Sequence, residues 1–168
     1  MSDRTYPGGV GRMIRAILHE PLDPGLELAS LTAASGKAGG VVSFVGLARE
    51  EDGGVAALVL QHHPVLTIRS LEKIAAVAKS RFAVDAVTAV HRAGTILLGE
   101  PIVFAGVAAR HRRDAFLAAD FLMDLLKTQA VFWKQEIGAT GARWIEPRLE
   151  DLADVARWNT TALEMAKQ

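Results

Sequence analysis

Basic residues gather at a point where the chain is expected to pass from a strand into a helix. The triplet His111-Arg112-Arg113 stands there, directly before Asp114, which is expected to cap the helix. Free backbone N–H groups and the positive end of a helix dipole would then lie beside the three side chains. The sequence leaves two interpretations open: the triplet binds an anion, or it ends a strand in solvent.

Lys127 and Lys134 form a second basic feature, seven residues apart and next to Phe132 and Trp133. On one continuous helix, at about 100° per residue, they would share a face about two turns apart. Like charges stacked on one face indicate an anionic ligand. The alternative is a solvated lysine face with aromatic side chains packed beneath it, and the spacing alone favours that alternative.

Three further places carry residues whose types could do chemistry. Arg49 ends an apolar strand and opens a Gly-rich loop, where a strand tip can present a guanidinium to a ligand. His62-His63 would point to opposite faces of a strand, and no third ligand stands at metal-binding spacing. Asp120 and Asp124 share a helix face, where neighbours such as Lys127 can pair with them. We therefore expect no metal site and no carboxylate acid/base pair.

The composition excludes several classes of function. Lys plus Arg and Asp plus Glu both number 19, so no overall positive field favours nucleic acid. The chain has no cysteine, which excludes a persulfide carrier, a thiolate metal site and a cysteine nucleophile. If the protein moves sulfur, another molecule must bring it. Dinucleotide, P-loop and Gly-x-Ser-x-Gly motifs are also missing from the sequence.

The length of 168 residues suits one domain with one core. No apolar run approaches the ~18 residues of a membrane span, so we expect a cytoplasmic protein that does not bind membranes. Residues 1–11 are polar and Gly-rich and are expected to be a flexible lead. Residues 12–158 are then a single domain, and residues 159–168 are a C-terminal tail.

The elements that must position the basic residues mix strands and helices without βαβ alternation. Residues 41–48 and 55–62 predict two strands joined by a polar loop as a hairpin. The expected class is α+β, with a mixed, mostly antiparallel sheet and packed helices. The other predicted strands are 12–19, 84–92, 102–109 and 142–146, and the predicted helices are 26–31, one after Pro64, 114–130 and 151–167.

Several stretches together resemble the large, catalytic subunit of molybdopterin synthase. Their order and spacing make the resemblance specific, and it covers roughly residues 39–158. It implies a fold like the α/β-hammerhead. The stretches are Gly40-Val-Val-Ser-Phe-Val-Gly-Leu-Ala-Arg49, Val90-His-Arg-Ala-Gly94, Pro101 to Arg112, Asp114-Ala-Phe116, Met123-Asp-Leu-Leu-Lys127-Thr128, Phe132-Trp-Lys134-Gln-Glu136 and Arg143-Trp-Ile-Glu146.

The resemblance implies a sulfurtransferase that acts in molybdenum cofactor biosynthesis. Such a subunit binds cyclic pyranopterin monophosphate and takes sulfur twice from the C-terminal thiocarboxylate of a small ubiquitin-like subunit, which builds the dithiolene of molybdopterin. It uses no cofactor or metal of its own, and it works as a homodimer within a heterotetramer. The absence of cysteine agrees with sulfur that is delivered by a partner.

Carried over by position, the resemblance implies that Lys127 and Lys134 are catalytic. Fixed cations would stabilise the charge that develops as a cyclic phosphate opens. Lysines suit proton transfer where neighbouring positive charge disfavours the ammonium form, and which of the two acts as acid or base stays open. The substrate-binding residues implied are Arg49, His111, Arg112, Gln135, Glu136 and Arg148.

His111 lies 16 residues before Lys127, which on one straight helix is about 24 Å. One small ligand cannot easily touch both. We therefore predict a site shared across a homodimer, with His111 and Arg112 from one protomer and Lys127 and Lys134 from the other.

Two positions depart from the pattern of the family: Leu47, where lysine is common, and Gln135, where arginine is common. Both remove positive charge, for which Arg143 and Arg148 are candidates to compensate. Two other functions compete with sulfur transfer. The chain could be a non-catalytic scaffold for a ubiquitin-like protein, or an enzyme for a different phosphorylated heterocycle.

Overall fold

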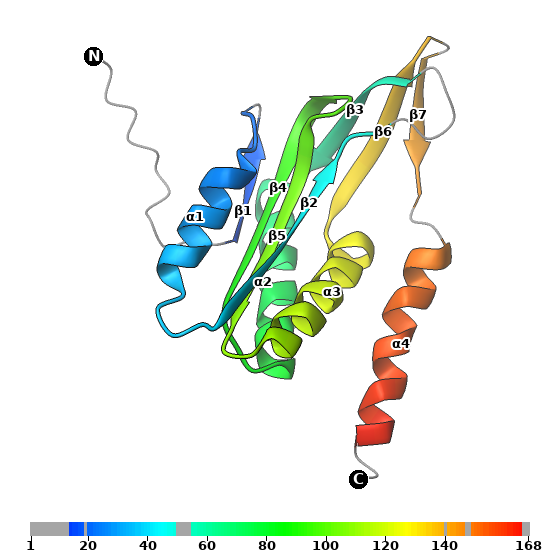
Figure 1. Cartoon of the computed structure of the whole chain (residues 1–168). Helices are drawn as coiled ribbons and strands as arrows, with labels where there is room; N and C mark the ends of the chain where they lie inside the picture. Colours follow the sequence, from blue (N-terminus) through cyan, green and yellow to red (C-terminus); the bar gives the residue numbers. More distant parts are fainter. Residues whose placement is uncertain (1–13, 19, 50–54, 140, 147–148, 166–168) are drawn as a thin grey trace, which may run out of the picture.

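The computed structural model describes residues 14–18, 20–49, 55–139, 141–146 and 149–165, which form strands and helices in mixed order (Figure 1). The strands are β1 Ile14–Leu18, β2 Gly40–Leu47, β3 Val55–His62, β4 Val84–Leu97, β5 Pro101–Ala109, β6 Phe132–Gly138 and β7 Gly141–Ile145. The helices are α1 Pro24–Ala34, α2 Pro64–Arg81, α3 Arg112–Gln129 and α4 Leu149–Met165.

The strands form one sheet in the order β2-β5-β4-β3-β6-β7, and each neighbouring pair is antiparallel. β1 pairs with β4 in parallel. The predicted α+β class with a mostly antiparallel sheet is therefore confirmed. The predicted hairpin of β2 and β3 is wrong, because β5 and β4 stand between them. β4 is 14 residues long, so its first part pairs with β5 and its last part with β3.

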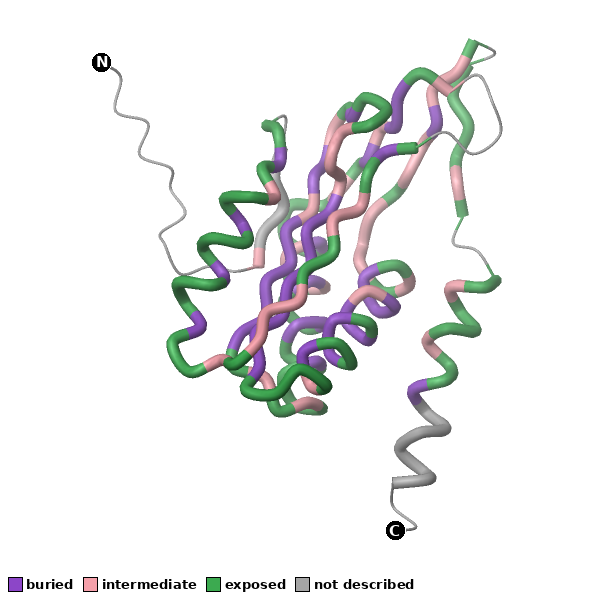
Figure 2. The backbone as a smooth tube through the Cα atoms, viewed as in Figure 1, coloured by how far each residue is buried: buried purple, intermediate pink, exposed green. Residues whose placement is uncertain are grey.

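Helices cover both faces of the sheet. α2 and α3 pack on one face, α1 packs on the other, and α4 packs on α3 (Figure 1). The buried segments follow the central strands and the sheet-facing sides of α2 and α3 (Figure 2). The largest core cluster joins Leu71 and Ile74 of α2 with Val107 of β5 and Leu122 of α3. Apolar residues at three- and four-residue steps give α2 and α3 each an apolar face that packs against the sheet.

Helix α3 begins two residues earlier than predicted. His111 has extended backbone at the N-cap, and its side chain makes no capping hydrogen bond. The prediction that Asp114 caps the helix is wrong, because Asp114 lies within the first turn. A carboxylate there still interacts favourably with the helix dipole. The N–H groups of the first turn are thus left without a side-chain cap, beside the side chains of His111 and Arg112.

Helix α3 ends at Gln129, so the idea of one helix running through both Lys127 and Lys134 is wrong. The next residues turn into β6, and α2 holds the backbone at that turn. Val131 N–H donates to Ser70 Oγ at 3.1 Å, and the Thr67 hydroxyl donates to Val131 O at 2.7 Å. These two hydrogen bonds hold the backbone N–H and C=O of Val131 against α2. The chain therefore turns out of α3 into β6, and Lys134 lies on that strand.

We expect Thr67→Val to lower the free energy of unfolding by about 1–3 kcal/mol, because it leaves buried polar groups without partners. Thr67 is fully buried, and its oxygen also accepts a hydrogen bond from His63 N–H at 3.1 Å. Urea denaturation of the two forms measures the difference. Thr67→Ser keeps the hydroxyl and is the matched control; equal stability of the Val and Ser variants would contradict the role of the hydroxyl.

Candidate active site

Lys134 is the third residue of β6 and is half-buried. It is paired across the sheet with Leu60 of β3 and Ile145 of β7, and residues paired in this way share one face. The side chain of Leu60 packs with Ala48, and Phe132 packs against the same cluster. Lys134 therefore lies on the face of the sheet that carries Ala48 and Phe132, near the end of β2.

Arg49 is exposed and follows Ala48, whose backbone is held on both sides by the turn between β4 and β5. Ala48 N–H donates to Glu100 O at 2.8 Å, and Gly99 N–H donates to Ala48 O at 2.7 Å. The structure thus brings Arg49 and Lys134, which are far apart in sequence, to the same end of the sheet.

A buried cation stabilises that turn. Arg92 Nη1 donates to Glu100 Oε2 at 2.9 Å, and Leu97 N–H donates to the same oxygen at 3.0 Å. The hydrogen bond from Leu97 and then the one from Arg92 hold the pKa of Glu100 below its ordinary value. These contacts hold the turn on which the backbone before Arg49 depends.

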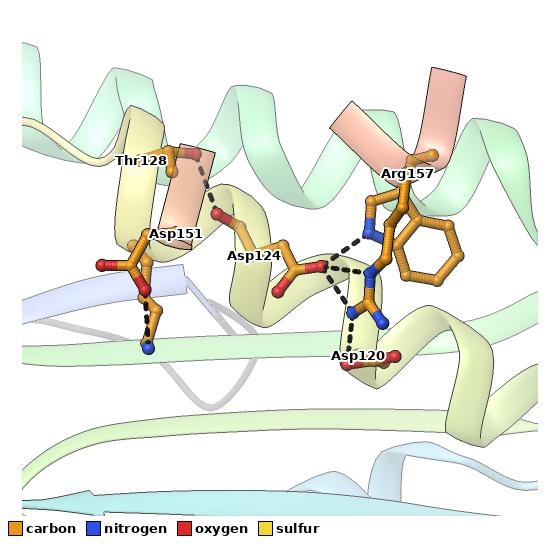
Figure 3. Close-up of polar contacts among 7 residues, drawn as sticks. Asp120, Asp124, Thr128, Asp151 and Arg157 are labelled. Carbon is orange, nitrogen blue, oxygen red and sulfur yellow. Dashed lines mark hydrogen bonds and ion pairs between the residues drawn. The ribbon is translucent and has the colours of Figure 1, made fainter. Parts of the chain in front are cut away.

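Lys127 lies in the last turn of α3, and its Nζ donates to Asp151 Oδ1 of α4 at 2.9 Å (Figure 3). The lysine side chain is 55% exposed and the aspartate side chain 14% exposed. Only two residues, Ala130 and Val131, separate the end of α3 from β6. Lys127 and Lys134 consequently lie on either side of one short connection.

Asp124 fastens α4 to α3 one turn before Lys127 (Figure 3). Its Oδ2 accepts hydrogen bonds from Arg157 Nη2 at 2.7 Å and from Trp158 Nε1 at 2.6 Å. Arg157 also forms an ion pair with Asp120 at 2.9 Å. The predicted pairing of Asp120 and Asp124 with Lys127 is therefore wrong. Both carboxylates form ion pairs with Arg157, and Lys127 forms one with Asp151. Asp151 belongs to a segment that carries no motif, so nothing in the sequence pointed to it.

His111 and Arg112 are exposed at the other end of α3. The helix is continuous from Arg112 to Gln129, so the about 24 Å between His111 and Lys127 at 1.5 Å per residue applies to the folded chain. Within one chain, the structure does not bring these two groups together.

The remaining predicted residues fall in three different places. Glu136 is buried on the same face as Lys134, and its Oε2 accepts from Arg143 Nη2 at 2.8 Å. Gln135 is paired with Trp144 and, by the alternation of a strand, faces the opposite side of the sheet from Lys134. Arg148 lies outside the described residues. The structure therefore groups Glu136, but not the side chain of Gln135, with Lys134.

His91 is a neighbour of this site that sequence reasoning missed. Its ring stacks on Phe132 at 4.1 Å between centroids, and its Nδ1 donates to Arg92 O at 2.8 Å. Burial lowers the pKa of His91 to about 4, against the smaller opposite effect of that hydrogen bond. His91 is therefore a neutral support for Phe132 at neutral pH.

Among the residues that the structure describes, no group of three or more His, Cys, Asp or Glu side chains could hold a metal ion. His63 instead caps α2, with Nδ1 accepting from Val65 N–H and Leu66 N–H at 3.2 Å each. No helix in the described ranges has the length and apolar character needed to cross a membrane.

The fold and the site define an α+β protein with basic residues at both ends of one helix. The sequence matches the family described as MoaE protein over residues 17–129. The molybdopterin synthase catalytic subunit of Caulobacter vibrioides is 45% identical over 150 residues, which is 89% of this chain and 100% of that protein. The chain belongs to the MoaE family.

Solved structures agree with this assignment. The molybdopterin biosynthesis MoaE protein of Burkholderia ambifaria has a TM-score of 0.74 and is 42% identical, covering 86% of this chain and 96% of its own. A Helicobacter pylori complex of subunits 1 and 2 of molybdopterin-converting factor has a TM-score of 0.66 at 21% identity, covering 79% of this chain and 91% of its own. That second likeness concerns the fold alone.

We expect the stability of the protein to fall as the pH drops from about 6.5 to about 4, because of His91. The pKa of this histidine is about 4 in the folded chain against an ordinary 6.5, so the unfolded chain takes up the proton first. The contribution of neutral His91 to the free energy of unfolding is fully present above pH 6.5, and roughly 3 kcal/mol of it is lost by pH 4. Urea denaturation at a series of pH values compares the parent with His91→Gln. Identical pH dependence of the two would contradict this role.

Proposed function

We propose that this chain is the catalytic subunit of a molybdopterin synthase, an enzyme of molybdenum cofactor biosynthesis. It transfers sulfur from the thiocarboxylated C-terminus of a small ubiquitin-like subunit to cyclic pyranopterin monophosphate. Two transfers build the dithiolene of molybdopterin. The observation that carries this proposal is the convergence of Arg49 and Lys134 at one end of the sheet, beside Lys127, in a chain without cysteine.

The surroundings of the two lysines support different roles for them. Asp151 holds the ammonium group of Lys127 in an ion pair, and this fixed cation suits the anionic tail of the sulfur donor. Lys134 is half-buried, and within the described residues no carboxylate pairs with it. It is the better placed of the two to exchange a proton with the substrate. Arg49 binds the phosphate at the same end of the sheet.

A second protomer completes the site. His111 and Arg112 cannot reach a small substrate held by Lys127 of their own chain, since about 24 Å of continuous helix separates them. In a homodimer each site takes Arg49, Lys127 and Lys134 from one chain and His111 and Arg112 from the other. One small subunit bound to each protomer makes the assembly a heterotetramer, in which the small subunit carries the sulfur that this cysteine-free chain cannot.

The other predicted substrate-binding residues have smaller roles in this proposal. Glu136 forms an ion pair with Arg143 and supports the face of β6 that carries Lys134. Gln135 contributes through the β6 backbone, because its side chain faces away. Arg148 stays a predicted contact.

We expect molybdopterin to form from cyclic pyranopterin monophosphate when the chain is supplied with a thiocarboxylated small subunit. Lys127→Ala should lower the rate by on the order of a hundredfold or more, because a positioned group of the reaction is lost. Lys79→Ala, on the exposed side of α2, is the matched control and should leave the rate unchanged. Fluorescence of the oxidised pterin product measures the rate, and thermal unfolding checks the fold. No product with a verified donor would favour the scaffold alternative.

Mixing protomers tests the shared site. Chains with Arg112→Ala and chains with Lys127→Ala should each be nearly inactive, yet half of the dimers after random exchange contain one intact site. Recovery to about a quarter of the activity of the unmodified protein is expected. Two affinity tags on the two chains verify the exchange. A mixture that stays inactive although mixed dimers are isolated would contradict the sharing of residues.

A further inference from the structure

The stretch Val90-His-Arg-Ala-Gly94 carries a histidine, His91, that none of the proposed catalytic or binding roles uses. His91 is paired with Val103 of β5, a member of the core cluster beneath α2 and α3, so its side chain lies on the face that these helices cover. Its ring stacks on Phe132 of β6 at 4.1 Å between centroids. Lys134 shares the face of Phe132 and follows it by about 7 Å along the strand. The imidazole therefore lies close to the proposed reaction centre.

The contacts of His91 determine which ring nitrogen carries the proton. Nδ1 lies 2.8 Å from the backbone oxygen of Arg92, which can only accept, so Nδ1 is the donor. The ring is neutral at neutral pH, because burial lowers the pKa of His91 to about 4. The other nitrogen of a neutral imidazole, Nε2, is then an acceptor. The stack on Phe132, with 25° between the ring planes, fixes the direction of its lone pair.

Nε2 of His91 reaches solvent. Within the described residues no group donates to it, and it is not one of the buried nitrogen atoms that lack a partner. The residue as a whole is half-buried. The Nδ1 side of the ring faces the backbone of β4, and Phe132 covers one ring face, so the accessible part includes the edge that carries Nε2. A neutral acceptor is therefore available beside Phe132.

The basic groups of the proposed site leave a need for such an acceptor. Arginine and lysine side chains carry donors only. Asp151 is in an ion pair with Lys127. Glu136, the carboxylate on β6, is buried and in an ion pair with Arg143. A phosphate is matched by donors, but the heterocycle of the proposed substrate also bears N–H groups, which lose free energy on leaving water unless they meet an acceptor. Nε2 of His91 supplies one.

We propose that Nε2 of His91 accepts a hydrogen bond from an N–H group of the substrate heterocycle and thereby orients the heterocycle beside Lys134. The proposal rests on the proposed function and assigns a further contact of its substrate. His91 binds and transfers no proton, so it acts equally on the bound substrate and on the transition state. Arg49 holds the phosphate and His91 the ring, and two separate contacts set the orientation of one bound molecule.

His91→Phe removes the acceptor and keeps an aromatic ring against Phe132. The KM for cyclic pyranopterin monophosphate should rise about tenfold while kcat changes less than about threefold, because a hydrogen bond made throughout the reaction is lost. His91→Gln restores an acceptor and should recover much of the affinity. Val87→Ala is the matched control, since it removes buried volume from the same face of β4 and should leave KM unchanged.

Three kinetic results would overturn the inference. One is a His91→Phe protein with the KM of the unmodified chain. Another is a fall of kcat at constant KM in both His91 variants, which is the effect of a structural support for Phe132. The third is an equal rise of KM in Val87→Ala, because lost stability and not the missing acceptor would then be the cause.

A binding measurement separates this contact from catalysis. The Nε2 resonance of ¹⁵N-labelled His91 is assigned by its loss in His91→Phe, and cyclic pyranopterin monophosphate is added anaerobically without the small subunit. The resonance should move to lower frequency, as expected for a nitrogen lone pair that accepts a hydrogen bond, and inorganic phosphate should leave it in place.

The outcomes of this measurement distinguish the contact from the function. A resonance that moves with phosphate, or only when the small subunit is added, overturns the inference. Formation of molybdopterin by a protein whose resonance does not move with the substrate also overturns the inference and leaves the proposed function intact. A resonance that moves with the substrate, in a protein that makes no product with a verified donor, overturns the proposed function and leaves His91 as a contact of the heterocycle.

Discussion

The length of one rigid helix is the constraint on which the account of this protein depends. α3 runs without interruption from Arg112 to Gln129, and it separates the basic pair at its start from Lys127 near its end by about 24 Å. No rearrangement of exposed side chains closes that gap. A site that uses both ends must take them from two chains, so in the proposed homodimer the second protomer would take part in the chemistry.

At the end of the sheet where Arg49 and Lys134 lie, the proposed site depends on backbone contacts between segments that are far apart in the sequence. Thr67 and Ser70 hold Val131, which turns the chain out of α3 and places Lys134 on β6. The turn around Glu100 holds Ala48 and thereby Arg49. The backbone that carries Lys134 and Arg49 is thus fixed through hydrogen bonds that contain no basic side chain of the proposed site.

The sequence predicted what depends on local pattern and missed what depends on pairing at a distance. The α2 and α3 helices were predicted from apolar residues at three- and four-residue steps, and the mixed, mostly antiparallel α+β class followed from the order of the elements. The predicted hairpin of β2 and β3 was wrong because several strands have similar apolar sequences, and such sequences do not specify which strands pair. The sequence does not reveal that Lys134 lies on a strand, because the turn before it depends on contacts between Val131 and α2, which are some 60 residues apart in the chain. The sequence does not point to Asp151, because its ion pair with Lys127 forms only when α4 packs on α3.

The most direct test of the shared site uses a chain that carries both Arg112→Ala and Lys127→Ala, paired with an unmodified chain. If each site draws on both protomers, both sites of this mixed dimer lack one residue, and molybdopterin formation falls to near the level of the doubly substituted protein. If each chain holds a complete site, the unmodified protomer keeps its own, and the purified mixed dimer retains half of the normal activity. The first result is predicted, and the second would contradict the account.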